Sequence, residues 1–294
     1  PHVFIAGDAC HTHSAKAGQG MNVSMMDTFN LGWKLAAVLR GRAAASLLHS
    51  YSAERQTVAQ NLIDFDREWS AFIAQPTADP EHPELGGVTA KEMREQFARQ
   101  GRYTAGLATK YLPSALTGSD THQSLATGFE IGTRFHSAPV VRVADAKRME
   151  LGHAHRADGR WRIYAFGDSA GIALREFAQW LSESPEAPTQ RFRTADEDID
   201  SVIDVHAVFR TGHHDVDLRE VPEILLPHSG PFHLQDWEKV WAIDAMGPDI
   251  FAARGVHASG AVVVVRPDQY VAHVLPLGVR EELTEFLGGV LLAR

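Results

Sequence analysis

The feature that most constrains the fold is a short apolar run that leads into a glycine-containing loop and then into a long helical pattern. Residues 3–6 are Val-Phe-Ile-Ala, a composition that favours a buried strand. Residues 7–20 are mostly polar, with glycines at both ends of the stretch, and after them apolar residues recur at helical steps of three and four. This order predicts a strand, a loop and a helix whose N-terminus lies at the end of the loop.

That helix N-terminus makes the loop a candidate site for an anion or a flat cofactor. The first N–H groups of a helix have no partner within the helix and form the positive end of its dipole. Gly18 and Gly20 would let the backbone approach a ligand such as a flavin closely, and Asp8 could accept a hydrogen bond from a ligand hydroxyl. From these residues alone the Gly-x-Gly signal is weak, and an ordinary capped turn is the favoured interpretation.

Two helical patterns follow the loop, and each has one apolar face. The first ends near Gly41 and places five apolar residues on one face: Met25, Met26, Phe29, Trp33 and Ala36. The second does the same with Val58, Leu62, Phe65, Trp69 and Phe72. We expect both stripes to be buried core rather than part of a cofactor site.

The remaining sequence predicts a linker followed by alternating strands and helices. Prolines and glycines between residues 76 and 87 indicate a linker or crossover, with a short helix over 91–99. Strand-like runs occupy residues 140–143, 162–166, 202–209, 261–266 and 270–275, and helical segments occupy 172–181 and 280–292. We therefore expect a mixed α/β fold divided into residues 1–75, 76–125 and 126–294.

Composition narrows the classes of partner and compartment. With 28 basic against 37 acidic residues, the net charge of −9 disfavours nucleic acid as a partner. No apolar run is long enough to span a membrane, and no signal peptide is recognisable. Cys10 is the single cysteine, so a disulfide framework is excluded and a cytoplasmic location is expected. Because a buried strand at residues 3–6 needs partners and Pro1 is not an initiator Met, we expect the natural protein to continue upstream.

Three segments of the chain resemble a known family. Residues 4–14 (Phe-Ile-Ala-Gly-Asp-Ala-Cys-His-Thr-His-Ser), 17–22 (Ala-Gly-Gln-Gly-Met-Asn) and 27–35 (Asp-Thr-Phe-Asn-Leu-Gly-Trp-Lys-Leu) resemble the second FAD-binding signature of single-component flavoprotein aromatic hydroxylases. The closest resemblance is to the branch with phenol hydroxylase and 3-hydroxybenzoate 4-hydroxylase, and Tyr51 with Glu54 and Arg55 fits that branch. Its members carry an additional C-terminal thioredoxin-like domain.

The resemblance implies a fold, a reaction and a set of cofactor contacts. The fold would be the end of a Rossmann-type FAD-binding domain, a linker and a thioredoxin-like domain with a role in homodimer contacts. NADPH would reduce FAD, O2 would add at the flavin C4a atom, and the hydroperoxide would hydroxylate phenol or a hydroxybenzoate. The implied FAD contacts are Gly7, Asp8, Gly18, Gln19, Gly20, Met21 and Asn22. Ala15 stands where many relatives have Pro. Residues for catalysis and substrate binding are not identifiable here and are expected upstream.

Other motifs suggest different chemistry. Cys10, His11 and His13 could be drawn as metal ligands, but a zinc site needs further ligands at matching spacing, so no metal is expected. We expect the histidine pairs at 153/155 and 213/214 to be solvated.

Two alternative functions remain open. Gly-Asp-Ser-Ala-Gly at 167–171 matches the nucleophile elbow of α/β-hydrolases, which would make Ser169 a nucleophile with Asp249 and His273 as partners. Against this, the strands that should precede such an elbow are missing. In the thioredoxin-like interpretation the same turn replaces Cys-x-x-Cys, and one cysteine cannot support dithiol chemistry. The second alternative is a non-catalytic assembly module.

Overall fold

The computed structural model describes residues 3–12, 19–78 and 86–294, and these form two compact units. Unit 1 comprises Pro1–Leu35 and Ala45–Thr109, and unit 2 comprises Ala36–Ala44 and Lys110–Arg294. The division near residue 109 lies inside the predicted linker, so the expected boundaries at 75 and 125 stay a prediction about domains. No described helix is both long and apolar enough to cross a lipid bilayer.

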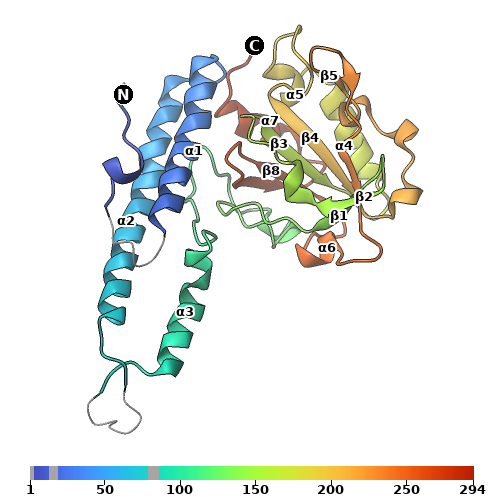
Figure 1. The fold of residues 1–294 in the computed structure, drawn as a ribbon. Coiled ribbons are helices and arrows are strands. Elements are labelled where there is room, and N and C mark those ends of the chain that lie inside the picture. The colour runs from blue at the N-terminus through green and yellow to red at the C-terminus, as the bar shows by residue number, and fades with distance from the viewer. Residues whose placement is uncertain (1–2, 13–18, 79–85) are drawn as a thin grey trace. The chain divides into compact units, whose positions relative to one another are not determined.

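Unit 1 is helical in its described part (Figure 1). The helices are α1 (Gly20–Leu39), α2 (His49–Ile73) and α3 (Ala90–Thr104), with short 3-10 turns η1 (Gly7–Ala9) and η3 (Ala45–Leu48). A capping box starts α3, because the Thr89 hydroxyl accepts from the Glu92 N–H while the Glu92 carboxylate accepts from the Thr89 N–H. The predicted short helix at 91–99 is thus confirmed and is longer than expected.

The prediction of a buried strand at residues 3–6 is wrong for the structure described here. The segment carries no strand pairing to any described residue, and Val3 and Ile5 are 82% and 55% exposed. Apolar character alone does not make a strand, since the backbone groups need a neighbouring strand to pair with. The Ile5 carbonyl instead accepts a hydrogen bond from the Tyr51 hydroxyl on α2, at 2.7 Å.

The buried face of α1 is not the predicted apolar stripe. Trp33 is buried as expected, but Met25 is 53% exposed. The residues that α1 buries at steps of four, three and four are Val23, Asp27, Asn30 and Lys34. Three of these four are polar, so hydropathy pointed to the wrong face. The second helix follows its prediction, since Val58, Leu62, Phe65 and Trp69 are all buried on α2, although Tyr51, Glu54 and Arg55 are buried with them.

Unit 2 contains a seven-stranded sheet in the order β2-β1-β7-β4-β3-β8-β9 (Figure 1). Its strands are β1 (Pro139–Arg142), β2 (Lys147–Glu150), β3 (Trp161–Phe166), β4 (Ile203–Phe209), β7 (Val240–Ala242), β8 (Ala261–Val265) and β9 (Val271–Leu275). β3, β4 and β7 are parallel and the other pairings are antiparallel. A separate two-stranded sheet is formed by β5 (His228–Ser229) and β6 (Leu234–Gln235). The helices are α4 (Ile172–Glu183), α5 (Pro188–Arg191), α6 (Ile250–Ala253) and α7 (Arg280–Gly288).

This sheet confirms the mixed α/β fold and all five predicted strands, which correspond to β1, β3, β4, β8 and β9. β2 was missed because its sequence is Lys-Arg-Met-Glu, and β7 because it has only three residues. The hairpin from β8 to β9 turns at Pro267 and Asp268 as predicted, with Gln269 in the left-handed region at φ 69°. At this turn the buried Arg266 forms two hydrogen bonds to the Asp268 carboxylate.

One face of the sheet is apolar at one end of β3 and β4 and charged at the other end. β3 and β4 run in parallel register with Arg162 beside Asp204, Tyr164 beside His206 and Phe166 beside Val208. Because side chains alternate between faces, these six lie on the same face. Phe166 and Val208 join the main apolar core with Phe129, Phe251 and Val263. At the other end the same face carries buried charge.

Candidate cofactor site

The predicted cofactor contacts fall on the turn η1 and on the first turn of α1. Gly7 and Asp8 lie in η1, while Gln19 directly precedes α1, and Gly20, Met21 and Asn22 begin it. Gly18 lies outside the described residues, as do His13 and Ala15. Gly7 has φ 63°, a left-handed conformation that favours glycine, and a Cβ there would crowd the Ser24 side chain at 3.0 Å. The structure therefore brings the two halves of the predicted site to α1.

The start of α1 provides hydrogen-bond donors for a ligand. Within the described residues, the first backbone hydrogen bond of this turn runs from the Val23 N–H to the Gln19 carbonyl, at 3.0 Å. The N–H groups of Gly20, Met21 and Asn22 come before it and have no acceptor within the helix. Asp8 is exposed, and its carboxylate accepts from the Ser24 hydroxyl at 3.4 Å, which leaves acceptor capacity. The N–H donors at the start of α1 and the carboxylate of Asp8 together fit a ligand that has an electron-rich ring edge and a hydroxylated chain, as FAD has.

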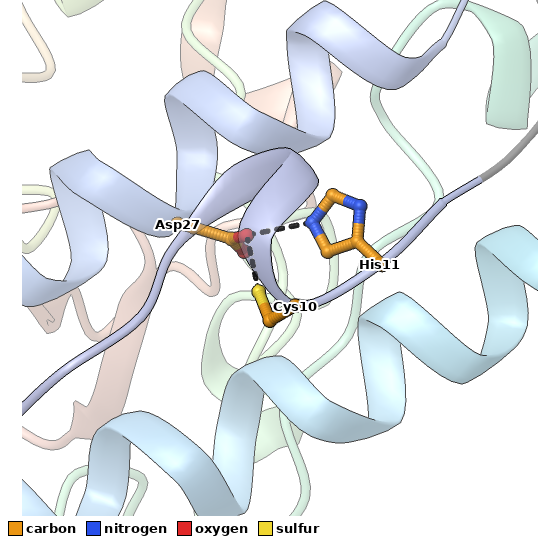
Figure 2. Close-up of side chains that lie close together, drawn as sticks. All are labelled: Cys10, His11 and Asp27. Atoms are coloured by element: carbon orange, nitrogen blue, oxygen red, sulfur yellow. Dashed lines mark hydrogen bonds and ion pairs between the residues drawn. The ribbon is translucent and has the colours of Figure 1, made fainter.

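A buried carboxylate on α1 holds the turn η1 in place. Figure 2 shows the Asp27 carboxylate directed at both the His11 ring and the Cys10 sulfur. Its Oδ2 accepts from the Gly7 N–H at 3.1 Å and lies 2.8 Å from His11 Nε2, while its Oδ1 lies 2.6 Å from Arg55 Nε. A carboxylate paired with Arg55 can only accept, so His11 Nε2 carries a proton. We call Asp27, His11 and Arg55 the Asp27 cluster.

A second buried cluster lies beside the first, with Asn30 and Lys34 one to two turns after Asp27 on α1 and Glu54 directly before Arg55 on α2. Lys34 Nζ donates to Glu54 Oε2 at 2.7 Å and to Asn30 Oδ1 at 2.8 Å, and Asn30 Nδ2 donates to the same Glu54 oxygen at 2.8 Å. We call Lys34, Glu54 and Asn30 the Glu54 cluster. The hydrogen bonds from Lys34 and Asn30 to Glu54 join α1 to α2, and the bond from Lys34 to Asn30 lies within α1. The sequence did not reveal either cluster, although the charged residues among helical core positions were a usable signal.

The cluster environment also shifts two pKa values nearby. Burial, followed by the Asp27 charge, raises the pKa of the Cys10 thiol. Burial and then the same charge raise the pKa of Tyr51 to about 12, so its hydroxyl stays protonated and can donate to the Ile5 carbonyl. The Cys10 thiol is therefore a poorer nucleophile than an ordinary cysteine.

The Asp27 cluster overlaps a group of possible metal ligands. Ligand atoms of Cys10, His11 and Asp27 all lie within 4.8 Å of one another. However, the Arg55 guanidinium already pairs with Asp27, and a cation there would be repelled by it. The contacts therefore favour an internal hydrogen-bonded cluster, and the expectation that the chain holds no metal stays a prediction.

The predictions for histidines in unit 2 need one correction. His153 and His214 are exposed, but His155 is buried, contrary to expectation. Burial, together with the Arg162 charge, lowers the pKa of His155 to about 3. The sequence could not distinguish the two histidines because the turn η6 (Leu151–Ala154), which follows β2, leaves His153 exposed while His155 directly after it is buried.

The residues of the hydrolase hypothesis make unrelated contacts. Ser169 is exposed and its hydroxyl lies 3.4 Å from the Ala258 carbonyl. His273 is buried, with Nε2 3.3 Å from Glu282, and Asp249 accepts from the Phe251 N–H at the start of α6. Among the contacts of the described residues, none joins Ser169 to His273 or Asp249. The turn between β3 and α4 has the elbow sequence without the triad.

Two known protein families match parts of this chain. Residues 109–294 match the family described as the phenol hydroxylase C-terminal dimerisation domain, and residues 2–66 match the FAD-binding domain family. The chain belongs to the phenol hydroxylase C-terminal dimerisation domain family. The resemblance drawn from residues 4–35 is thereby confirmed, and so is FAD as the cofactor of the matched N-terminal family.

Individual relatives are enzymes about twice as long. The chain is 53% identical to a 3-hydroxybenzoate 4-monooxygenase of Comamonas testosteroni, a match that covers 97% of this chain and 46% of the relative. It is 31% identical to a phenol 2-monooxygenase of Aspergillus fumigatus, over 98% of this chain and 47% of the relative. The chain thus spans about half the length of the curated relatives it matches.

Solved structures agree in fold. The flavin-dependent monooxygenase PieE, in complex with FAD and substrate, matches 97% of this chain and 47% of its own with a TM-score of 0.59 at 21% identity. Aklavinone-11 hydroxylase, in a ternary complex with FAD and aklavinone, matches with a TM-score of 0.56 at 19% identity. At these identities the likeness shows the fold.

Proposed function

We propose that the whole protein is an FAD-dependent monooxygenase that hydroxylates a phenolic ring, with NADPH and O2 as co-substrates. The observation that carries the proposal is the arrangement of Asp8 and the α1 N-terminus at one site, fixed by the Asp27 cluster. The similarity to a 3-hydroxybenzoate 4-monooxygenase at 53% identity supports a hydroxybenzoate or phenol as substrate.

The proposed FAD contacts divide into two groups with different chemistry. The Asp8 carboxylate accepts a hydrogen bond from a hydroxyl of the ribityl chain, while Gly7 keeps the backbone close to α1. The N–H groups of Gly20, Met21 and Asn22, at the start of α1, would hold the pyrimidine edge of the flavin ring together with Gln19; the predicted contact Gly18 lies outside the described residues. The positive end of α1 stabilises negative charge that gathers on that edge.

The bound FAD supplies the two-electron carrier and the centre at which oxygen is activated. The residues of this chain bind and orient it, and they hold its reduced form through the α1 N-terminus. Residues that bind the phenolic ring or remove its proton are not assigned to this chain, and we place them in the part of the relatives that it does not span.

Unit 2 is proposed to be a thioredoxin-like dimerisation module. The parallel β3-α4-β4 arrangement, followed by the antiparallel pair β8 and β9 and then α7, supports the thioredoxin-like assignment. The family match over residues 109–294 supports a homodimer. One cysteine in the sequence and a cofactor reduced by NADPH support a cytoplasmic location.

The decisive experiment is an absorption spectrum of the purified whole protein, followed by NADPH oxidation with and without phenol and 3-hydroxybenzoate. We expect a flavin spectrum and NADPH consumption that the aromatic compound accelerates, with a hydroxylated product. A colourless protein that takes up no added FAD would contradict the proposal, and the hydrolase and assembly-module alternatives would then be tested next.

A further inference from the structure

We propose that His11 and Asp27 are positioning residues of the flavin site, which set the placement of Asp8 relative to the α1 N-terminus. The inference rests on the proposed function, because it concerns how that site holds FAD. Neither residue belongs to the predicted set of FAD contacts. Both are almost fully buried, at 3% and 1% exposure.

Asp27 makes contacts to the loop in addition to the one that joins the two helices. The pair between Asp27 Oδ1 and Arg55 Nε joins α1 to α2, as the Glu54 cluster also does. Its second oxygen, Oδ2, is used for the loop, where it accepts from the Gly7 N–H and from His11 Nε2. These two contacts lie on either side of Asp8. The carboxylate that would hold the ribityl chain is therefore fixed between two anchor points.

His11 is the more informative of the two residues. Its side chain meets Asp27 across 16 positions of sequence, so it closes the loop onto α1 after η1. Its removal leaves the ion pair between Asp27 and Arg55 intact. The effect of His11 on FAD can thus be measured without leaving a buried charge unpaired, which replacement of Asp27 would do.

Three substitutions in the whole protein test the proposal. His11→Phe keeps a ring and loses the donor. His11→Gln retains it, because the amide nitrogen of Gln reaches about as far as Nε2 of His. Glu54→Gln is the matched control, since it weakens the second buried cluster on the same helices, where the hydrogen bonds given for Glu54 among the described residues come from Asn30 and Lys34. The measurements are the FAD dissociation constant of each apoprotein, from flavin fluorescence, and the melting temperature of each apoprotein.

We expect His11→Phe to raise the FAD dissociation constant roughly tenfold or more, as the loss of a hydrogen bond to a charged group implies. His11→Gln should stay within about threefold of wild type, and Glu54→Gln should lower the melting temperature while keeping the FAD dissociation constant within about threefold. If His11→Phe does not fold, His11→Asn replaces it, because its amide nitrogen lies at the Nδ1 position and does not reach Asp27.

Each other outcome overturns the inference in a distinguishable way. If the donor-lacking variant binds FAD as wild type does, His11 does not position the site. If Glu54→Gln weakens FAD binding as much as the His11 variant, the effect is general destabilisation of α1 and α2. If wild-type apoprotein binds no FAD, the proposed function itself fails, and the inference fails with it.

Discussion

Each of the two units buries an aspartate beside an arginine. The aspartate of unit 1 also contacts a loop, whereas the aspartate of unit 2 contacts side chains within and beside the sheet. In unit 1, Asp27 contacts Arg55 on α2, and its remaining acceptor capacity goes to the backbone and side chain of a loop. In unit 2, Asp204 on β4 contacts Lys239, and its Oδ2 lies 2.9 Å from Arg162 Nε on β3. The partners of Asp204 are side chains on its own strand, His206, and on or beside neighbouring strands.

This difference indicates what each buried charge is for. Buried ion pairs contribute little net stability, because desolvation offsets the Coulomb attraction, but they penalise any arrangement that separates the partners. In unit 2 that penalty enforces the register of β3 against β4, where Arg162 faces Asp204. In unit 1 it enforces the position of a loop. We therefore propose that the Asp27 cluster positions the loop that carries Asp8, and that Asp204 and its partners align the strands.

The largest expected effect tests the structural assignment of Asp204. Asp204→Asn leaves the fully buried Arg162 and Lys239 with less negative charge than they need, and we expect it to lower the free energy of unfolding by roughly 3 kcal/mol. FAD affinity should be unchanged. Chemical denaturation followed by tryptophan fluorescence measures the loss. The control is Asp236→Asn, whose carboxylate is partly exposed and 3.3 Å from Lys239, with an expected loss under about 1 kcal/mol.

The next effect is a pH dependence that should belong to unit 2 alone. His155 has a folded-state pKa of about 3, against about 6.5 in the unfolded chain. Between these values the unfolded chain binds a proton that the folded chain does not, so stability falls as the pH is lowered from 6.5 towards 3. We expect a loss of roughly 2–3 kcal/mol between pH 6.5 and 4.5 from this group. The buried His206, whose pKa is also lowered, adds in the same direction.

His155→Phe separates this contribution from that of other groups. Phe fills the site beside Tyr164 without nitrogens that need partners, so the variant should be as stable as wild type at pH 7 and more stable at pH 5. Unfolding free energies at the two pH values measure this. An unchanged pH slope would mean that His155 is solvated and protonates freely, as the sequence had suggested.

The sequence could predict those features of the fold that the pattern of apolar residues determines, and it missed those that depend on tertiary contacts. The strands β3, β4, β8 and β9 were predicted well because their runs are dominated by apolar residues. The buried face of α1 was missed because its members are polar and are stabilised by partners on α2, which a pattern along one helix cannot show. His155 was missed for the same reason, since burial of a neutral imidazole depends on tertiary contacts. The loop was found through resemblance, but the cluster that holds it was not.

A smaller effect tests the proposed contact between Asp8 in unit 1 and FAD. Asp8 is exposed and accepts from Ser24 across a long distance, so Asp8→Ala should leave stability nearly unchanged. We expect the variant to bind FAD roughly tenfold more weakly, through loss of a charged acceptor for a ribityl hydroxyl. Flavin content after gel filtration and a fluorescence titration measure this. Asp64→Ala, an exposed carboxylate on α2, is the control. Equal flavin affinity for both variants would argue against the proposed role of Asp8.

The smallest expected effect asks whether unit 2 has chemistry of its own. Ser169 lies exposed at the turn from β3 to α4, with one long hydrogen bond to Ala258, so Ser169→Ala should change stability by less than about 0.5 kcal/mol. Aromatic hydroxylation and FAD binding should be unaffected, as for Ser119→Ala, another exposed serine. Hydrolysis of a p-nitrophenyl ester is the added measurement. If wild type and Ser119→Ala hydrolyse the ester and Ser169→Ala does not, unit 2 holds a reactive centre of its own, and the proposal that it serves only for dimerisation must be abandoned.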